Sequence, residues 1–336
     1  TGEPKKGDVL EFVMTSDFFE DKMRTELGLD FSKFDPDTTD EFKNKSDKAY
    51  RLKVGGFLDR YNYEAMYEYI GRDYAVVGNQ MQQKDKEGLS VRGGAGLDVH
   101  SINLMLARYN DNVRGDELFP RIVNYQGNLD YSFNKIPNLP IGIGYQKSIQ
   151  DSTKEPQGSS PTSLYTDTIT GMVNYAMDKI NIGFQTAYSL MDDRAEANSD
   201  TTAITYTLTP TYNTSELSVN PNFSLNQSKS HLTGVRTDTY TINLDLRTKF
   251  FREKASFDVG GTCIIAKADD GSANTRNLNA KFRLSYSLKE YLKGILNPSI
   301  ALRVTYMNIT DKINPGSNRD VFTLFLVLAT SMPFSF

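Results

Sequence analysis

The sequence is poor in residues that build metal and redox sites. It has one cysteine, Cys263, and two histidines, His100 and His231, among 336 residues. A single cysteine excludes an internal disulfide and supplies no zinc-binding set. Nucleophile-elbow, metalloprotease, phosphate-loop and dinucleotide-binding motifs are also missing. The sequence therefore predicts neither an enzyme nor a resident cofactor.

The sequence also lacks a long hydrophobic run. Its longest uncharged apolar stretch, Val321 to Ala329, is far too short for a membrane-spanning helix. The mean hydropathy of -0.48 is that of a water-soluble chain. Membrane β-barrels give the same average, because lipid-facing and lumen-facing residues alternate along each strand and cancel.

Tryptophan is absent, whereas tyrosine and phenylalanine number nineteen each. An aromatic belt at a membrane interface would have to be built from these two residue types. Aromatic residues do gather beside the short predicted turns, with Tyr61, Tyr63, Tyr131 and Phe133 as examples.

Excess positive charge is missing as well. The net charge is -4 and the pI is near 5.4, which argues against a nucleic-acid partner. No signal peptide is visible at Thr1. The sequence is therefore expected to be a mature form after cleavage or the C-terminal domain of something longer.

What the chain does have is an alternation of period two, and its last sixteen residues show it best. Phe322, Leu324, Leu326 and Leu328 lie on one face of the predicted strand, and that face ends at the terminal aromatic Phe336. A chain that ends in this way resembles the Gram-negative outer-membrane β-barrels. In that family the insertion machinery reads the last strand, so the resemblance implies that Phe336, Phe334 and Met332 form the C-terminal insertion signature.

Alternation over the rest of the chain predicts an all-β fold, an antiparallel transmembrane barrel of about sixteen strands, with fourteen as the alternative. Residues 1–47 are expected to be a first strand, Val9 to Thr15, followed by a long and partly helical loop. Residues 48–336 form the remainder of a single barrel domain. The sixteen predicted strands fall near residues 9–15, 50–58, 63–69, 89–97, 102–106, 123–133, 141–145, 169–175, 180–188, 204–209, 216–225, 240–249, 257–265, 278–288, 300–306 and 321–336.

Connections between these strands alternate in length, as membrane barrels require, with short turns on the periplasmic side and long loops outside. Short ones fall near residues 59–62, 98–101, 134–138, 177–180, 213–216, 250–254 and 289–298; long ones fall near 71–87, 110–120, 149–163, 191–202, 227–236, 267–276 and 309–319. A soluble β-sandwich is the alternative, but its solvated face would carry dense Lys and Glu where this chain has Thr, Asn, Ser and Gly.

The charged residues on the polar parity of the strands are the candidate site, because charges are costly in lipid and are expected to line the lumen. They either pair across strands or set the selectivity of an aqueous pore. The basic candidates are Arg51, Lys53, Arg92, Arg247, Lys249, Lys281, Arg283 and Arg303. The acidic candidates are Glu64, Glu68, Asp98, Asp130, Glu216, Asp245 and Asp258. Arg51, Lys53, Lys281, Arg283 and Arg303 are predicted to share one basic sector of the wall.

Other polar residues carry weaker signals. A protease or phospholipase site beside His231 would need Asp192 or Asp193, but a solvated loop histidine is the simpler interpretation. Calcium binding by Asp35, Asp37 and Asp40, or by Asp269 and Asp270, is disfavoured because no EF-hand loop is present. The sequence thus predicts no metal site, and it places Cys263 on the apolar parity as a small lipid-facing residue.

The predicted function is an outer-membrane porin-like channel for small polar solutes, anionic ones included. Two alternatives remain open: the barrel conduit of a larger export complex, such as one secreting a polysaccharide, and a surface adhesin or scaffold barrel. The expected partners are outer-membrane lipid and lipopolysaccharide, the insertion machinery, and a second copy or a periplasmic protein.

Two structural expectations follow. Val9–Thr15 should pair with Phe322–Met332 to close the barrel. The loop from Gly71 to Gly88 should be ordered and fold into or over the lumen, because Tyr74, Ala75, Val76 and Val77 are too apolar for a freely solvated tip.

Overall fold

A computed structural model describes residues 5–20, 22–39, 44–76, 84–195, 199–289 and 297–331. These residues form seventeen strands of one antiparallel sheet and a single short 3-10 helix, Pro315–Ser317. The strands are β1 (Lys6–Phe18), β2 (Met23–Asp35), β3 (Lys45–Leu58), β4 (Tyr61–Ile70), β5 (Lys86–Leu97), β6 (His100–Asn110), β7 (Arg121–Phe133), β8 (Ile141–Thr153), β9 (Ser163–Met177), β10 (Ile180–Asp193), β11 (Thr201–Asn213), β12 (Leu217–Ser230), β13 (Arg236–Phe250), β14 (Ala255–Ala268), β15 (Asn274–Ser287), β16 (Asn297–Asp311) and β17 (Arg319–Ser331).

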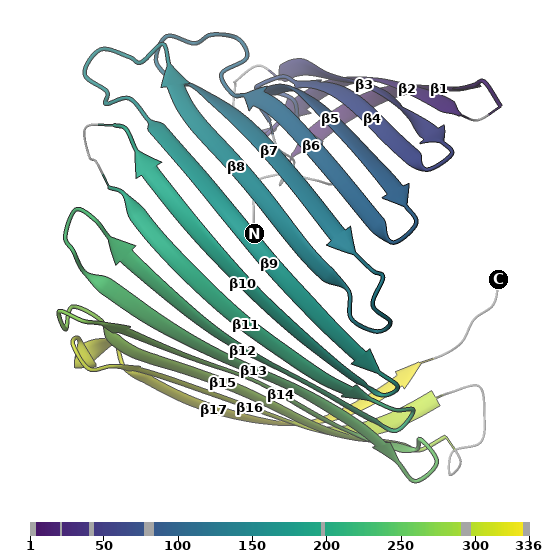
Figure 1. The fold of residues 1–336 in the computed structure, drawn as a ribbon, viewed down its shortest axis with the longest axis vertical. Helices are drawn as coiled ribbons and strands as arrows, with labels where there is room; N and C mark the ends of the chain where they lie inside the picture. The colour runs from purple at the N-terminus through teal and green to yellow at the C-terminus, as the bar shows by residue number, and fades with distance from the viewer. Residues whose placement is uncertain are drawn as a thin grey trace. The chain divides into compact units, whose positions relative to one another are not determined.

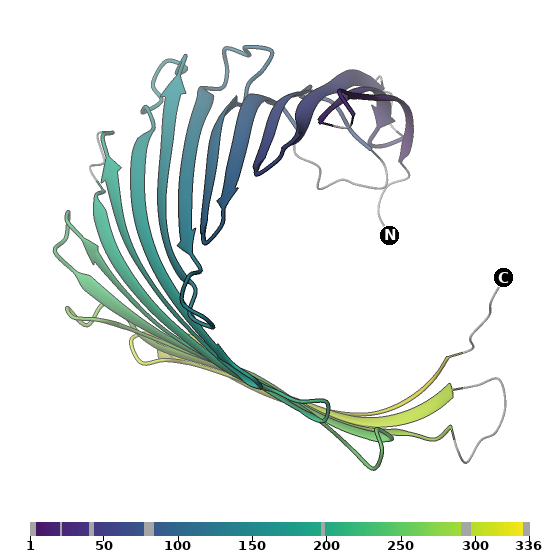
Figure 2. The ribbon, with the colours of Figure 1, turned by 45° about the vertical axis from the view of Figure 1, so that its right-hand side comes forward.

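Each strand is followed along the chain by its neighbour in the sheet, as the labels of Figure 1 show for β5, β6 and β7. Two-residue turns begin at Asp59, Asp98 and Asp178, whose φ angles are 52°, 52° and 46°. Tight hairpins need this left-handed conformation, and aspartate tolerates it better than most residues. The expected short connections after β3, β5 and β9 are therefore confirmed, and Figure 2 shows the first two in the purple to blue part of the ribbon.

The strand count differs from the expectation by one, because residues 23–35 form β2 where a helical segment was predicted. Apolar Phe18 and Phe19 ahead of this segment, together with Met23 at its start, suggested helical spacing. From Met23 onward, however, Leu27, Leu29 and Phe31 alternate with polar residues and pair with β1 at Met14, Phe12 and Leu10. The prediction of a partly helical first loop was wrong.

The extra strand bears on closure. If every hairpin is antiparallel, β1 and β17 have the same sense, so the predicted direct ladder between them would be parallel. Bacterial barrels of one chain usually have an even number of strands. Pairing of β1 with β17 remains a prediction.

Contacts divide the chain into two compact units. Unit 1 comprises residues 1–135, 142–169 and 190–200, and unit 2 comprises residues 136–141, 170–189 and 201–336. In unit 1 the ladders run from β1 through β7, and in unit 2 they run from β11 through β17.

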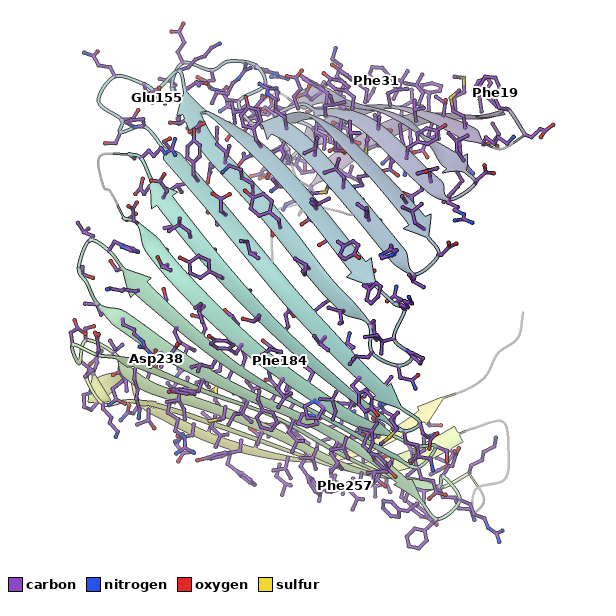
Figure 3. All side chains as sticks on the ribbon, in the orientation of Figure 1. Phe19, Phe31, Glu155, Phe184, Asp238 and Phe257 are labelled. Carbon is purple, nitrogen blue, oxygen red and sulfur yellow. The ribbon has the colours of Figure 1, made fainter. Side chains whose placement is uncertain are left out.

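The two faces of the sheet differ in both units. On the apolar face, cross-strand neighbours include Phe12 and Leu29 in unit 1, and Leu302 and Leu326 in unit 2. Leu326 is 72% exposed, and none of the described large side chains is fully buried. Figure 3 shows Phe31 and Phe184 on the strands themselves, whereas Glu155 lies in the loop after β8. So much exposed apolar surface has to be covered by lipid.

The strands have the length that a membrane requires. They run from 10 residues in β4 to 15 in β9, and a tilted strand crosses a bilayer with about 9–11 residues. In the described part of the chain no helix is both long and apolar enough to span a bilayer.

Candidate functional site

The polar face of unit 2 carries a cluster of bases on three of the four consecutive strands β13 to β16, here called the basic patch: Arg247 on β13, Lys281 and Arg283 on β15, and Arg303 on β16. Arg283 lies directly opposite Arg303, and Lys281 lies directly opposite Thr305. Like charges opposite one another destabilise a sheet, so their juxtaposition has no structural benefit.

Carboxylates neutralise only part of the basic patch. Arg247 Nε donates to Asp258 Oδ1 at 2.6 Å, and Asp258 lies opposite both Arg247 and Arg283 in the register. Asp245, two residues before Arg247, is the other acid of the cluster. Among the described residues, Lys281, Arg283 and Arg303 have no carboxylate within salt-bridge distance. Four bases thus face two acids, which leaves a local net charge of +2.

These side chains line a hollow of about 560 Å³, with Ser218 and Asn220 on its β12 side. The Arg247 side chain is 71% exposed, so the patch is accessible to solutes. Arginine and lysine donors in such a hollow can bind carboxylate, phosphate or sulfate groups.

Two of the candidate bases of unit 1, Arg51 and Lys53, are arranged differently, because carboxylates on neighbouring strands neutralise them. Arg51 Nη2 lies 2.6 Å from Glu26, and Lys53 Nζ lies 2.7 Å from Glu64. Lys53 and Glu64 line a hollow of about 870 Å³ that also contains Arg92. Arg51 and Lys53 were predicted to belong to the basic sector, but the carboxylates paired with them cancel most of the positive field that they would produce.

The remaining predicted site residues lie in several places. Glu68 on β4 pairs with Lys86 at 3.1 Å, and Asp130 on β7 accepts a hydrogen bond of 2.5 Å from Asn128. Lys249, near the end of β13, lies 3.5 Å from Glu253 in the next turn. Asp98 and Glu216 are not on strands, because they fall in the turns before β6 and β12. Phe336, Phe334 and Met332 lie outside the described residues.

The histidines and acidic residues considered as weaker candidates make hydrogen bonds with nearby groups. His100 bonds to the Tyr131 hydroxyl at 2.7 Å, and His231 bonds to the Thr202 hydroxyl at 2.6 Å. Asp37 accepts hydrogen bonds from the Thr39 hydroxyl and, second, from the Thr39 amide, and these bonds hold the pKa of the exposed Asp37 carboxyl below its ordinary value. Asp270 accepts the Ser272 amide at 2.9 Å.

In the described ranges, no group of three or more His, Cys, Asp or Glu side chains is placed to bind a metal ion. Asp40 lies outside those ranges. Cys263 is on the apolar face, as predicted, opposite Ile242 and Leu278.

The loop between β4 and β5 folds onto the polar face of unit 1. Tyr74 and Ala75 are only 3% and 5% exposed, and Tyr74 packs with Ala49 and Ile70. The Ala75 amide donates to Ser32 Oγ at 3.2 Å. Residues 71–76 pack against the sheet, as expected, and do not form a solvated tip; residues 77–83, Val77 among them, lie outside the described ranges.

An ion cluster anchors this loop, and we call Asp47, Asp73 and Arg114 the loop lock. Arg114 lies 2.7 Å from Asp47 and 2.8 Å from Asp73, while the Asp73 amide donates to Asp47 at 2.8 Å. The Asp47 side chain is 5% exposed. Gly71 is required here, because a Cβ at this position would collide with the Asp47 carboxylate.

A second ion pair extends the lock toward the β6–β7 loop. Asp116 accepts hydrogen bonds from the Leu118 amide and from Arg72. These two bonds, the amide first, hold the pKa of the Asp116 carboxyl below its ordinary value. None of these charged residues is among the site residues predicted from the sequence. The only available signal was an Arg and an Asp within three residues of each other in both loops.

Comparison with known proteins adds a fold-level likeness only. No protein-family model and no curated protein matches the sequence. A bacterial polysaccharide outer-membrane secretin aligns at 11% identity and a TM-score of 0.42, over 87% of this chain and 92% of that chain. An anion-selective porin from Comamonas acidovorans aligns at 10% and 0.41, over 90% of each chain. The ferric yersiniabactin uptake receptor FyuA from Yersinia pestis aligns at 11% and 0.48, over 98% and 72%.

These likenesses are too remote to transfer a ligand or the role of a residue. The exposed apolar face and the strand lengths identify the environment of the sheet. The connections differ clearly in length only as far as β12: those at 231–235 and 269–273, which were expected to be long, are about as short as the one at 251–254. The fold is that of the antiparallel transmembrane barrels of the bacterial outer membrane, and the protein is an integral protein of that membrane.

Proposed function

We propose that the protein is an outer-membrane channel for small polar solutes that favours anions. The single observation that carries the proposal is the basic patch, where Lys281, Arg283 and Arg303 keep their charges without carboxylate partners among the described residues. Beside a low-dielectric wall such charges focus a positive field into the adjacent water, even though the whole chain carries -4.

The patch suits transient binding. A passing anion needs contacts that favour entry but release it again, and solvent-exposed bases provide such contacts better than a closed pocket. Because Arg283 and Arg303 lie opposite each other, they can hold one carboxylate or phosphate between them.

Liposome swelling tests the proposal. Vesicles containing the folded protein should take up a small organic anion faster than a cation of the same size. The triple variant Lys281→Gln, Arg283→Gln, Arg303→Gln should lose this difference. The matched control removes three charges from the apolar face of the same unit, in Lys229→Gln, Lys267→Gln, Arg276→Gln, and should keep it.

The other readouts separate the alternatives. An adhesin or scaffold barrel would give no swelling with either solute. A conduit for an anionic polysaccharide would use the same patch. Adding that polysaccharide should then block the uptake of a neutral sugar by the vesicles, whereas uptake through a simple porin should stay unchanged.

A further inference from the structure

The apolar face of unit 1 contains a groove that the channel proposal does not use. It has a volume of about 600 Å³ and crosses β5, β6, β7 and β8. Val91, Leu106 and Gly127 lie side by side across its middle, in register. Gly127 forms the floor of the groove and has no side chain to fill it. There is room above it, since a Cβ at this position would have only Leu106 Cδ2 within 4 Å, at 3.5 Å. The groove is thus the space that a glycine leaves between large apolar side chains.

The walls of the groove are apolar and exposed. Leu89, Leu104 and Leu129 are 53%, 43% and 45% exposed. The volume is within the range of about 300–1,000 Å³ that is usual for ligand sites, and an acyl chain is the apolar ligand that a membrane supplies.

One end of the groove is positively charged. Arg108 lies on the apolar face of β6, between Leu89 and Tyr125, and its guanidinium lies 5.8 Å from the Tyr125 ring centre. Among the described groove residues, Lys147 is already paired with Asp167 at 3.0 Å, whereas Arg108 has no carboxylate partner. An unpaired arginine on a lipid-facing surface is costly unless an anion meets it.

The height of Arg108 on the sheet fits a lipid headgroup. It lies near the end of β6 (His100–Asn110) that leads into the long β6–β7 connection, which is the outer side of a membrane barrel. Eight residues of strand at about 3.3 Å each, tilted by about 40°, rise about 20 Å, close to the outer edge of an apolar band about 25 Å tall. The groove below Arg108 therefore lies at the depth of outer-leaflet acyl chains.

We infer that this groove binds one acyl chain of the lipid A part of lipopolysaccharide, with Arg108 holding a lipid A phosphate. The Tyr125 ring lies within cation–π distance of the guanidinium, and the Gly127 floor accepts the chain. The occupant is a lipid A molecule of the outer leaflet and not a phospholipid, because the site opens on the outer side.

Native mass spectrometry of the detergent-folded protein tests this inference. The protein should retain one lipid A molecule in preference to phosphatidylglycerol. Arg108→Gln should weaken retention about tenfold or more, the loss expected for one hydrogen bond to a charged group. Arg276→Gln is the matched control, since Arg276 is also exposed on the apolar face, near the start of β15, but does not line this groove.

A second variant separates the acyl chain from the phosphate. Gly127→Leu should fill the groove and weaken the retention of both lipid A and dephosphorylated lipid A. Arg108→Gln should leave the retention of dephosphorylated lipid A unchanged. Heat-modifiable migration on gels checks that each variant folds. Equal retention of phosphatidylglycerol, or equal losses in Arg108→Gln and Arg276→Gln, would show that only ordinary annular lipid covers this face and would overturn the inference.

Discussion

Removing Arg114 should release the β4–β5 loop from the polar face. In Arg114→Gln the nearly buried Asp47 carboxylate loses its only guanidinium among the described residues, and Asp73 loses the same partner. Two hydrogen bonds to charged groups would be worth more if both partners were buried, but the Arg114 side chain is 46% exposed. Solvent screening reduces the expected cost to about 2 kcal/mol, or about a thirtyfold rise in the open fraction of the loop.

Hydrogen exchange detects this opening at a defined atom. The Ala75 amide donates to Ser32 Oγ in the closed loop, so its exchange reports the open fraction. Exchange should be faster in Arg114→Gln, and unchanged in the control Lys135→Gln, which removes a charge from an exposed turn of the same unit. Asp47→Asn should have a similar effect, and the double variant should add little to either single change. Unchanged Ala75 exchange in Arg114→Gln would refute the loop lock.

Three further predictions concern the same sheet. Since the pKa of Asp116 is below its ordinary value, its stabilisation of the loop is present above about pH 4 and should be lost as the pH falls further, which intrinsic-rate-corrected amide exchange would report. Gly71→Ala should lower the thermal midpoint through collision with Asp47, whereas Gly93→Ala, whose Cβ would meet nothing closer than 3.8 Å, should not. Single cysteines along Val9–Thr15 and Phe322–Met332 should form disulfide cross-links if the barrel closes there, and failure of every pair would exclude that closure.

The strands could be predicted because each has an apolar face of period two, and that signal needs no knowledge of neighbours. The prediction for segment 23–35 was wrong because Phe18 and Phe19 ahead of it, with Met23 at its start, obscured the period of two that Leu27, Leu29 and Phe31 follow. Turn lengths then placed Lys281, Arg283 and Arg303 on adjacent strands. The direct opposition of Arg283 and Arg303 needed the register, which the sequence does not encode locally.

The loop lock could not be predicted in the same way. Arg114 and Asp47 are 67 residues apart in the chain, and their contact depends on how two loops fold back over the sheet. Likewise, the ion pairs of Arg51 and Lys53 depend on which carboxylates the register places beside them. Periodicity identifies the face of a charged residue, whereas neutralisation is decided by neighbours that only the tertiary structure brings together.

The reversal potential across a planar bilayer tests the central claim most directly. Under a tenfold KCl gradient a perfectly selective pore would give about 59 mV. The wild type should give a potential with the sign of anion permeation, and the preference should shrink at 1 M salt, where screening acts over about 3 Å. Removing Lys281, Arg283 and Arg303 changes the local charge of the patch from +2 to -1, so the sign should be lost or reversed, while the apolar-face control keeps it. A wild type without anion preference, or a triple variant with the wild-type potential, would contradict the account.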